Sequence, residues 1–124
     1  MKCRSLAESF SHAIDGVVYT IRNERNMRIH ISAAIIVVIV SAVFKISAIE
    51  FALVFLAIGL VLVSEIVNTA IEAVVDMMVK EYREEARIAK DVAAGASFIA
   101  ALIAVLIGIN VFGWRVLEWI RMLW

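Results

Sequence analysis

The sequence predicts an all-α integral membrane protein, with three transmembrane helices and an amphipathic surface helix at the N-terminus. Two observations favour this fold class, and a third concerns possible partners. Hydrophobic residues make up 64% of the 124 residues, whereas soluble domains contain about 45–50%. Long apolar stretches recur three times in a chain that has no proline to break them. The net charge is zero, so the charge balance does not indicate a nucleic-acid partner.

The first 28 residues are expected to form an amphipathic helix that lies on the membrane surface. Apolar side chains recur at helical spacing from Leu6 to Ile21, with polar and charged residues between them. The segment lacks the uninterrupted apolar core and the cleavage site of a signal peptide. The single cysteine, Cys3, predicts that the chain has no internal disulfide.

Three membrane spans are expected to follow, and together with the surface helix they form a single domain over residues 1–124. The spans are predicted at 29–49, 50–79 and 92–112. The charged segment 80–90 connects the last two spans, and Asp91 is expected to cap the third. Residues 113–124 contain all three tryptophans and are predicted to form an interfacial tail.

The distribution of Lys and Arg predicts which side of the membrane each loop faces. Basic residues are concentrated before the first span and in segment 80–90, while the loop between the first two spans carries only Lys45. Because short basic loops remain in the cytoplasm, the N-terminus and the second loop are expected to face it. The cytoplasmic end of the second span is then the place where a charged site would meet cytoplasmic solutes.

That end of the second span carries a stripe of polar residues on an otherwise apolar helix. Glu65, Asn68, Glu72 and Asp76 follow one another at spacings of three, four and four residues. At helical periodicity they fall within an arc of about 80° on one face. Carboxylates at this depth cost several kcal/mol unless they are paired, protonated or bound to a cation. The stripe therefore predicts a functional site, and its oxygen ligands suit a hard cation such as Mg²⁺.

The position of the stripe suggests phosphoryl transfer from a cytoplasmic nucleotide to a membrane alcohol. Arg83, Arg87 and Lys90 would supply positive charge for phosphates, and the deepest acid could accept a proton from a lipid hydroxyl. The chain lacks both the GxxxxGK[ST] and the GxGxxG nucleotide loops, which excludes a kinase of the soluble type. Two alternatives remain open: a small proton-coupled transporter, which would place its acid near the membrane centre, and a non-enzymatic accessory subunit.

Three segments of the chain resemble a known family. EIVNTAIEAVVD at 65–76, EYREEARIAKD at 81–91, and Asn23, Glu24 and Arg28 closely resemble the signature of the small prokaryotic diacylglycerol kinases and undecaprenol kinases. The resemblance covers essentially the whole chain. It implies a homotrimeric helical bundle in the bacterial cell membrane, with an active site that faces the cytoplasm and uses MgATP to phosphorylate a lipid alcohol.

The resemblance also implies a role for each site residue. Glu65 would be the general base on the lipid hydroxyl, and Glu24 and Glu72 would hold Mg²⁺ with the ATP phosphates. Asn68, Asp76 and Arg28 would shape the site or bind substrate. Nucleotide contacts are implied for Glu24, Glu72, Glu81, Tyr82, Arg83, Lys90 and Asp91. A simpler interpretation of Glu24 and Arg28 is an ion pair along one helix, because they lie four residues apart.

Departures from the family pattern bear on the lipid substrate. NERNMRIH at 23–30 resembles the Gram-positive branch, whose substrate is undecaprenol, whereas Gram-negative diacylglycerol kinases carry an acid where this chain has His30. Undecaprenol is therefore the expected acceptor and diacylglycerol the alternative. Ser5, beside Arg4, occupies the aligned position of a nucleotide-binding arginine in the Gram-negative branch. His12 and His30 are expected to form interfacial hydrogen bonds and not to bind metal.

Overall fold

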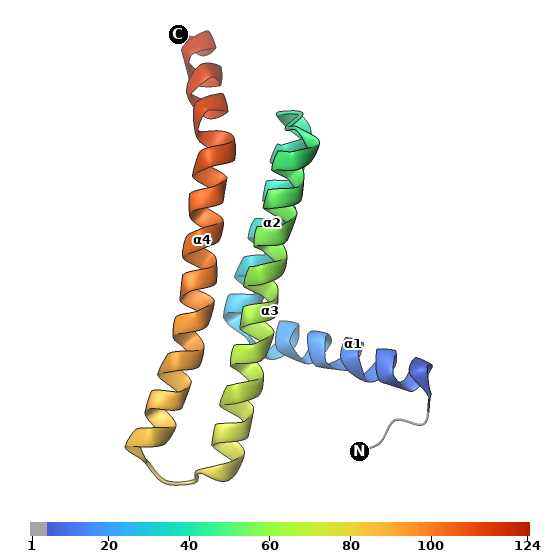
Figure 1. Cartoon of the computed structure of the whole chain (residues 1–124), viewed down its shortest axis with the longest axis vertical. Coiled ribbons are helices and arrows are strands. Elements are labelled where there is room, and N and C mark those ends of the chain that lie inside the picture. Colours follow the sequence, from blue (N-terminus) through green and yellow to red (C-terminus); the bar gives the residue numbers. More distant parts are fainter. Residues whose placement is uncertain (1–4) are drawn as a thin grey trace.

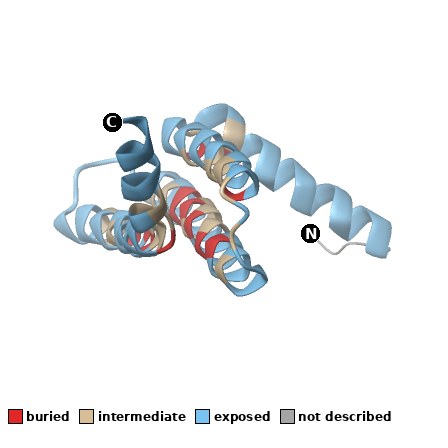
Figure 2. Cartoon of the chain, turned by 90° about the horizontal axis from the view of Figure 1, so that it is seen from above, coloured by how far each residue is buried: buried red, intermediate tan, exposed pale blue. Residues whose placement is uncertain are grey.

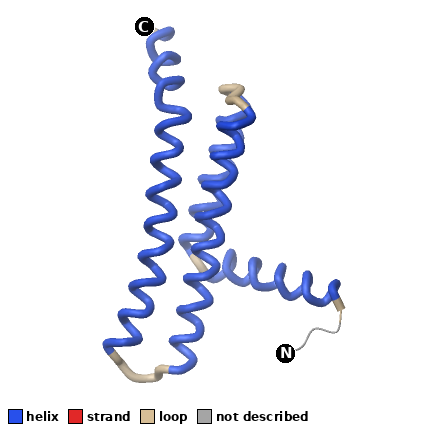
Figure 3. Tube along the Cα trace, viewed as in Figure 1, coloured by secondary structure: helices blue, strands red, loops and turns tan. Residues whose placement is uncertain are grey.

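The computed structural model describes residues 5–124 and consists, in that range, of four helices without strands (Figures 1 and 3). The helices are α1 (Leu6–Asn23), α2 (Arg25–Val43), α3 (Ala48–Met78) and α4 (Glu84–Leu123). The last three are long and apolar enough to cross a membrane, which confirms the predicted all-α membrane fold. Lys2, Cys3 and Arg4 lie outside the described residues.

The junction between α1 and α2 sets α1 across the other helices. Ser5 caps α1 by accepting a hydrogen bond from the Glu8 backbone N–H (3.2 Å), and the helix ends where Glu24 adopts extended backbone angles. Arg28 then donates to the carbonyls of residues 21 and 22 (3.1 and 2.9 Å). Its guanidinium thus supplies hydrogen bonds and positive charge to the backbone carbonyls at the C-terminal end of α1. The Glu24–Arg28 ion pair is therefore not formed, and α1 projects sideways from the bundle (Figure 1).

The helix of the first span begins and ends earlier than predicted, and a turn then leads from α2 to α3. That span was expected at 29–49, but α2 already begins at Arg25 and ends at Val43. Lys45 has a positive φ of 48°, which ends the helical path. Ser47 and Glu50 then form a capping box, with side chain to backbone distances of 3.2 and 2.8 Å, that starts α3.

The third span is part of a helix much longer than predicted. The helix begins at Glu84, with Arg83 as its N-cap, and continues without a break to Leu123. The prediction that Asp91 caps this span is therefore wrong, and the expected separate tail is the end of the same helix. A helix of this length extends about 60 Å, twice the hydrocarbon thickness of about 30 Å. Its ends must project beyond the membrane interior.

The core of the bundle lies between α3 and α4, which pack along most of their length. Buried residues lie where the helices face one another, while their outer faces are exposed and apolar (Figure 2). The buried apolar side chains are Met27, Val54, Ala57, Val61, Ala93, Ala100 and Val111. Small residues on α4 permit the close approach of α3. The exposed apolar faces suit contact with lipid or with further copies of the chain.

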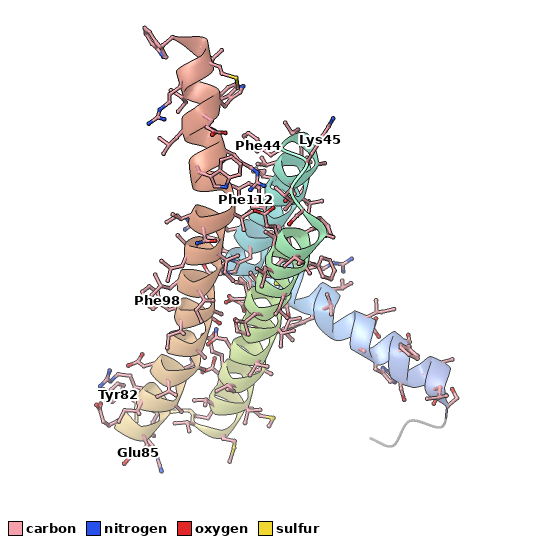
Figure 4. All side chains as sticks on the ribbon, turned by 45° about the horizontal axis from the view of Figure 1, so that its top comes forward. Phe44, Lys45, Tyr82, Glu85, Phe98 and Phe112 are labelled. Carbon is pink, nitrogen blue, oxygen red and sulfur yellow. The ribbon has the colours of Figure 1, made fainter. Side chains whose placement is uncertain are left out.

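The end of the bundle opposite the α3–α4 loop is closed by aromatic and charged contacts. The rings of Phe44 and Phe112 meet with their centroids 6.4 Å apart (Figure 4). Next to them, the Arg115 guanidinium donates to both carboxylate oxygens of Glu50 (2.8 and 2.9 Å) and to the Val111 carbonyl. This bidentate pair joins α4 to the first turn of α3 and fixes their relative positions.

Candidate active site

The polar stripe of α3 runs from the interior of the bundle toward water. Glu65 is 1% exposed and Asn68 is 7% exposed, whereas Glu72 is half-buried and Asp76 is exposed. The side-chain amide of Asn68 donates to one carboxylate oxygen of Glu72 (3.2 Å). The stripe is therefore graded, with its deepest carboxylate inside the protein and its last one at the surface.

A cavity of about 330 Å³ lies against the buried part of this stripe. It is lined by the N-terminal half of α2, the second half of α3 and the first half of α4. Its polar lining consists of Asn26, His30, Glu65, Asn68, Glu72 and Ser97. Three of these residues each have a buried atom without a hydrogen-bond partner among the described residues: Glu65 Oε1, Asn68 Oδ1 and Ser97 Oγ. Buried polar groups in native proteins are nearly always paired, so these atoms indicate a site for a polar ligand or water.

A second, apolar groove of about 360 Å³ adjoins the polar cavity. The two share His30 and Ala101 in their linings. Apart from His30, every residue that lines the groove is apolar, and the groove follows α2, α3 and α4 as far as Phe112. A molecule with a polar head and a hydrocarbon chain would match the two spaces together.

The charged residues of the α3–α4 hairpin lie beyond the cavity, at the end that carries the loop. Lys90 Nζ contacts the Asp76 carboxylate at 2.6 Å, and Arg87 pairs with Asp91 at 2.7 Å. Tyr82 lies in the loop at this end (Figure 4). Its hydroxyl donates to the carboxylate of Glu84, the first residue of α4 (2.7 Å). These side chains are all at least partly exposed, so they can exchange partners for a charged solute.

Glu81 and Arg83 flank Tyr82 and are exposed as well. Together with Lys90 and Asp91 they make up the residues that were expected to contact nucleotide, apart from Glu24 and Glu72. The structure brings all of them to one end of the hairpin, on α4 and the loop that precedes it. It also places Arg28 away from them, against the end of α1.

The described residues of one chain do not gather three His, Cys, Asp or Glu side chains at the spacing of a metal site. Glu72 lines the cavity, but Glu24 does not; it lies at the α1–α2 junction, where its side chain makes no capping hydrogen bond. Mg²⁺ that arrives with a nucleotide is commonly held by one or two carboxylates together with the phosphates. The oxygen donors of Glu72 and Glu24 fit that chemistry if a second copy of the chain brings them together.

Sequence reasoning did not select Ser97 or Asn26, and it assigned His30 only an interfacial role. Ser97 had a signal that could have found it, because it is the lone polar side chain between Val92 and Ile109. His30 lines both spaces, which depends on how α2 packs and could not be inferred from its position in the chain.

Comparison with known proteins identifies the family. A family profile described as prokaryotic diacylglycerol kinase matches residues 11–112. The chain belongs to this family. The matched segment includes every residue of the cavity and of the charged hairpin, so the site lies within the part of the chain that the family shares.

Two curated members of the family show the extent of the similarity. The undecaprenol kinase of Bacillus subtilis (strain 168) is 43% identical over 65 residues, which is 52% of this chain and 53% of that protein. The diacylglycerol kinase of Synechocystis sp. is 42% identical over 70 residues, which is 56% of this chain and 40% of that protein. The chain thus spans about half the length, or less, of the curated relatives it matches.

Proposed function

We propose that the chain is a MgATP-dependent lipid kinase that phosphorylates a membrane alcohol, with undecaprenol as the acceptor. The observation that carries this proposal is the buried carboxylate oxygen of Glu65, which has no partner among the described residues and lines a polar cavity that adjoins an apolar groove. A lipid alcohol fits this arrangement because its hydroxyl would reach Glu65 while its chain occupies the groove. Membership of a family that contains lipid kinases favours this proposal over the transporter and accessory-subunit alternatives.

In the proposed reaction, Glu65 acts as the general base. Its carboxylate accepts the proton of the lipid hydroxyl as the hydroxyl oxygen forms a bond to the γ-phosphorus of ATP, and the bond from that phosphorus to the bridging oxygen of ADP breaks. Asn68 holds Glu72 in place through its amide, and Asp76 holds Lys90. Bound Mg²⁺ would neutralise charge on the phosphates, and Glu72 and Glu24 would hold it.

The nucleotide is proposed to bind on the charged end of the hairpin. Lys90 would exchange its contact with Asp76 for a phosphate oxygen, and Asp91 would exchange its contact with Arg87 for the nucleotide. Glu81, Tyr82 and Arg83 would border the nucleotide from the loop. The exposure of these side chains supports the assignment, since each can change partner without leaving a buried charge unpaired.

A homotrimer is proposed because one chain does not complete the site. Glu24 lies outside the cavity in its own chain, and the apolar outer faces of the helices are uncovered. We therefore propose that Glu24 of one copy meets Glu72 of a neighbour. Mixing two inactive variants, Glu24→Gln and Glu65→Gln, should restore part of the activity if sites form between copies. Mixtures that stay inactive would contradict a shared site.

The membrane is proposed to be the bacterial cell membrane, with the hairpin loop and α1 on its cytoplasmic side. The concentration of Lys and Arg in residues 1–28 and 80–90 supports this orientation. It also gives the charged end of the hairpin access to cytoplasmic ATP. Thiol labelling of single cysteines placed in the loop and near Lys45, in intact cells, would test it.

The acceptor is tested by a substrate panel. We expect ATP turnover by the purified chain, in mixed micelles with Mg²⁺, to depend on added undecaprenol and to be weaker with diacylglycerol. Glu65→Gln should bind MgATP and assemble normally but lose turnover. A preference for diacylglycerol would refute undecaprenol as the acceptor but would be consistent with the proposed lipid kinase activity. ATP turnover that depends on neither lipid would refute the lipid kinase activity itself.

A further inference from the structure

One buried hydroxyl in the described chain differs from the others. Thr20, Ser41, Thr69 and Ser97 are all buried. The first three donate to the backbone carbonyl four residues earlier in their helices, at 3.1, 2.7 and 2.9 Å respectively. This local bond is the usual arrangement of a hydroxyl inside a helix. Ser97 lies within α4 and could make the same bond, yet its Oγ has no partner in residues 5–124.

The unpaired hydroxyl of Ser97 lines the cavity that also holds Glu65 Oε1 and Asn68 Oδ1. It comes from α4, while the two other unpaired atoms come from α3, so the polar groups face the cavity from two helices. Ser97 is 8% exposed. Of the three unpaired atoms it is the only one that can donate a hydrogen bond, because the other two are carbonyl or carboxylate oxygens.

We propose that Ser97 positions the reacting hydroxyl of the acceptor lipid opposite Glu65. This inference rests on the lipid kinase function proposed above. An alcohol has one hydrogen to donate and lone pairs that accept. Its hydrogen would be donated to the Glu65 carboxylate, and its oxygen would accept the hydrogen of Ser97 Oγ. The two side chains thereby hold the lipid hydroxyl in the cavity, and Ser97 contributes one hydrogen bond to its binding.

Ser97 takes no proton in this arrangement, so its loss affects binding of the lipid and not the chemical step. Removal of one neutral hydrogen bond corresponds to about a three- to tenfold loss of affinity. We therefore expect Ser97→Ala to raise the KM for the lipid by this factor, with kcat and the KM for ATP unchanged. Ser97→Thr keeps the hydroxyl and should restore the KM. Ser41→Ala removes a buried hydroxyl that already has a hydrogen-bond partner in its own helix, and it should leave the KM for lipid unchanged.

Two measurements test the inference independently of turnover. Saturable binding of radiolabelled undecaprenol, with diacylglycerol in a second arm, is measured without ATP on wild type, Ser97→Ala, Ser97→Thr and Ser41→Ala. Assembly size and melting temperature are measured on the same proteins. The inference is supported if Ser97→Ala binds lipid more weakly than the wild type while Ser97→Thr and Ser41→Ala bind it as the wild type does. This holds even if the wild type does not phosphorylate the lipid, because that result would refute only the kinase proposal.

Three outcomes overturn the inference. The first is a wild-type chain that binds neither lipid. The second is Ser97→Ala that binds lipid as tightly as the wild type, which would indicate that the hydroxyl binds water and not the lipid. The third is Ser97→Ala with a lower melting temperature, altered assembly and a parallel loss of ATP binding, which would make the hydroxyl a structural contact.

Discussion

Replacement of Glu65 by methionine should make the protein more stable and inactive. Glu65 is 1% exposed and its Oε1 has no hydrogen-bond partner among the described residues. A buried polar group left without a partner costs about 1–3 kcal/mol of folding free energy. Methionine has a similar length and no strongly polar atom, so Glu65→Met removes this cost. We expect the free energy of unfolding to increase by about 1–3 kcal/mol.

The same substitution removes the proposed general base. Loss of a general base typically lowers turnover by about 10²- to 10⁴-fold, so kinase activity should fall at least a hundredfold while stability rises. Unfolding is followed by circular dichroism during titration of detergent micelles with a denaturing detergent, and activity by lipid-dependent ATP turnover. Glu65→Gln is the matched control: it keeps polar atoms in the cavity and should lose turnover without a gain in stability.

One result would refute this reasoning. If Glu65→Met lowers the free energy of unfolding, the carboxylate must be paired in the assembled protein and is a structural contact. Such a result would also remove one of the three unpaired atoms that indicate a ligand in the cavity.

Further predictions concern the nucleotide, the metal and the bundle. Lys90→Ala should raise the KM for ATP about tenfold, through loss of a charge-assisted contact to phosphate, with the KM for lipid unchanged in steady-state kinetics. EDTA should stop turnover and excess Mg²⁺ should restore it; turnover in EDTA would exclude a divalent ion. Arg115→Ala should lower the melting temperature but leave the KM for ATP unchanged, since Arg115 pairs with Glu50 at the end of the bundle opposite the hairpin loop; an altered KM for ATP would contradict this. Ala100→Ile should destabilise the bundle by about 1–3 kcal/mol because Ala100 is buried; an unchanged unfolding curve would contradict close packing there.

The fold class and the polar stripe were predictable because both depend on local periodicity. Three apolar stretches predict three spans, and the spacing of Glu65, Asn68, Glu72 and Asp76 places them on one face of any helix. The order of burial along this stripe also follows from the position of each residue relative to the membrane. The structure confirms the all-helical fold, and Glu65 and Asn68 are indeed buried within it.

Helix boundaries were less predictable because hydropathy marks the edge of the membrane and not the end of a helix. The helical segments 25–28 and 84–91 are rich in polar residues. They extend α2 and α4 at their N-terminal ends, beyond the apolar part of each helix. A helix that leaves the membrane still satisfies its own backbone, so nothing in composition requires it to stop. The capping box formed by Ser47 and Glu50 was a readable signal for the start of α3.

Tertiary pairings could not be read from the sequence. Glu50 and Arg115 lie 65 residues apart, and nothing local indicates that α4 returns to the first turn of α3. The cavity at Ser97 likewise depends on the packing of three helices. The position of Glu24 outside that cavity depends on the sharp break between α1 and α2, which the helical pattern of residues 1–28 conceals.

The most direct test is to identify the product. Purified protein in lipid vesicles is mixed with undecaprenol, Mg²⁺ and ATP labelled on the γ-phosphate, and the lipid extract is separated and examined by mass spectrometry. We expect labelled undecaprenyl phosphate from the wild type and none above background from Glu65→Gln. Labelled lipid at equal rates from both proteins, or label found only in inorganic phosphate, would contradict the proposal that Glu65 activates a lipid hydroxyl.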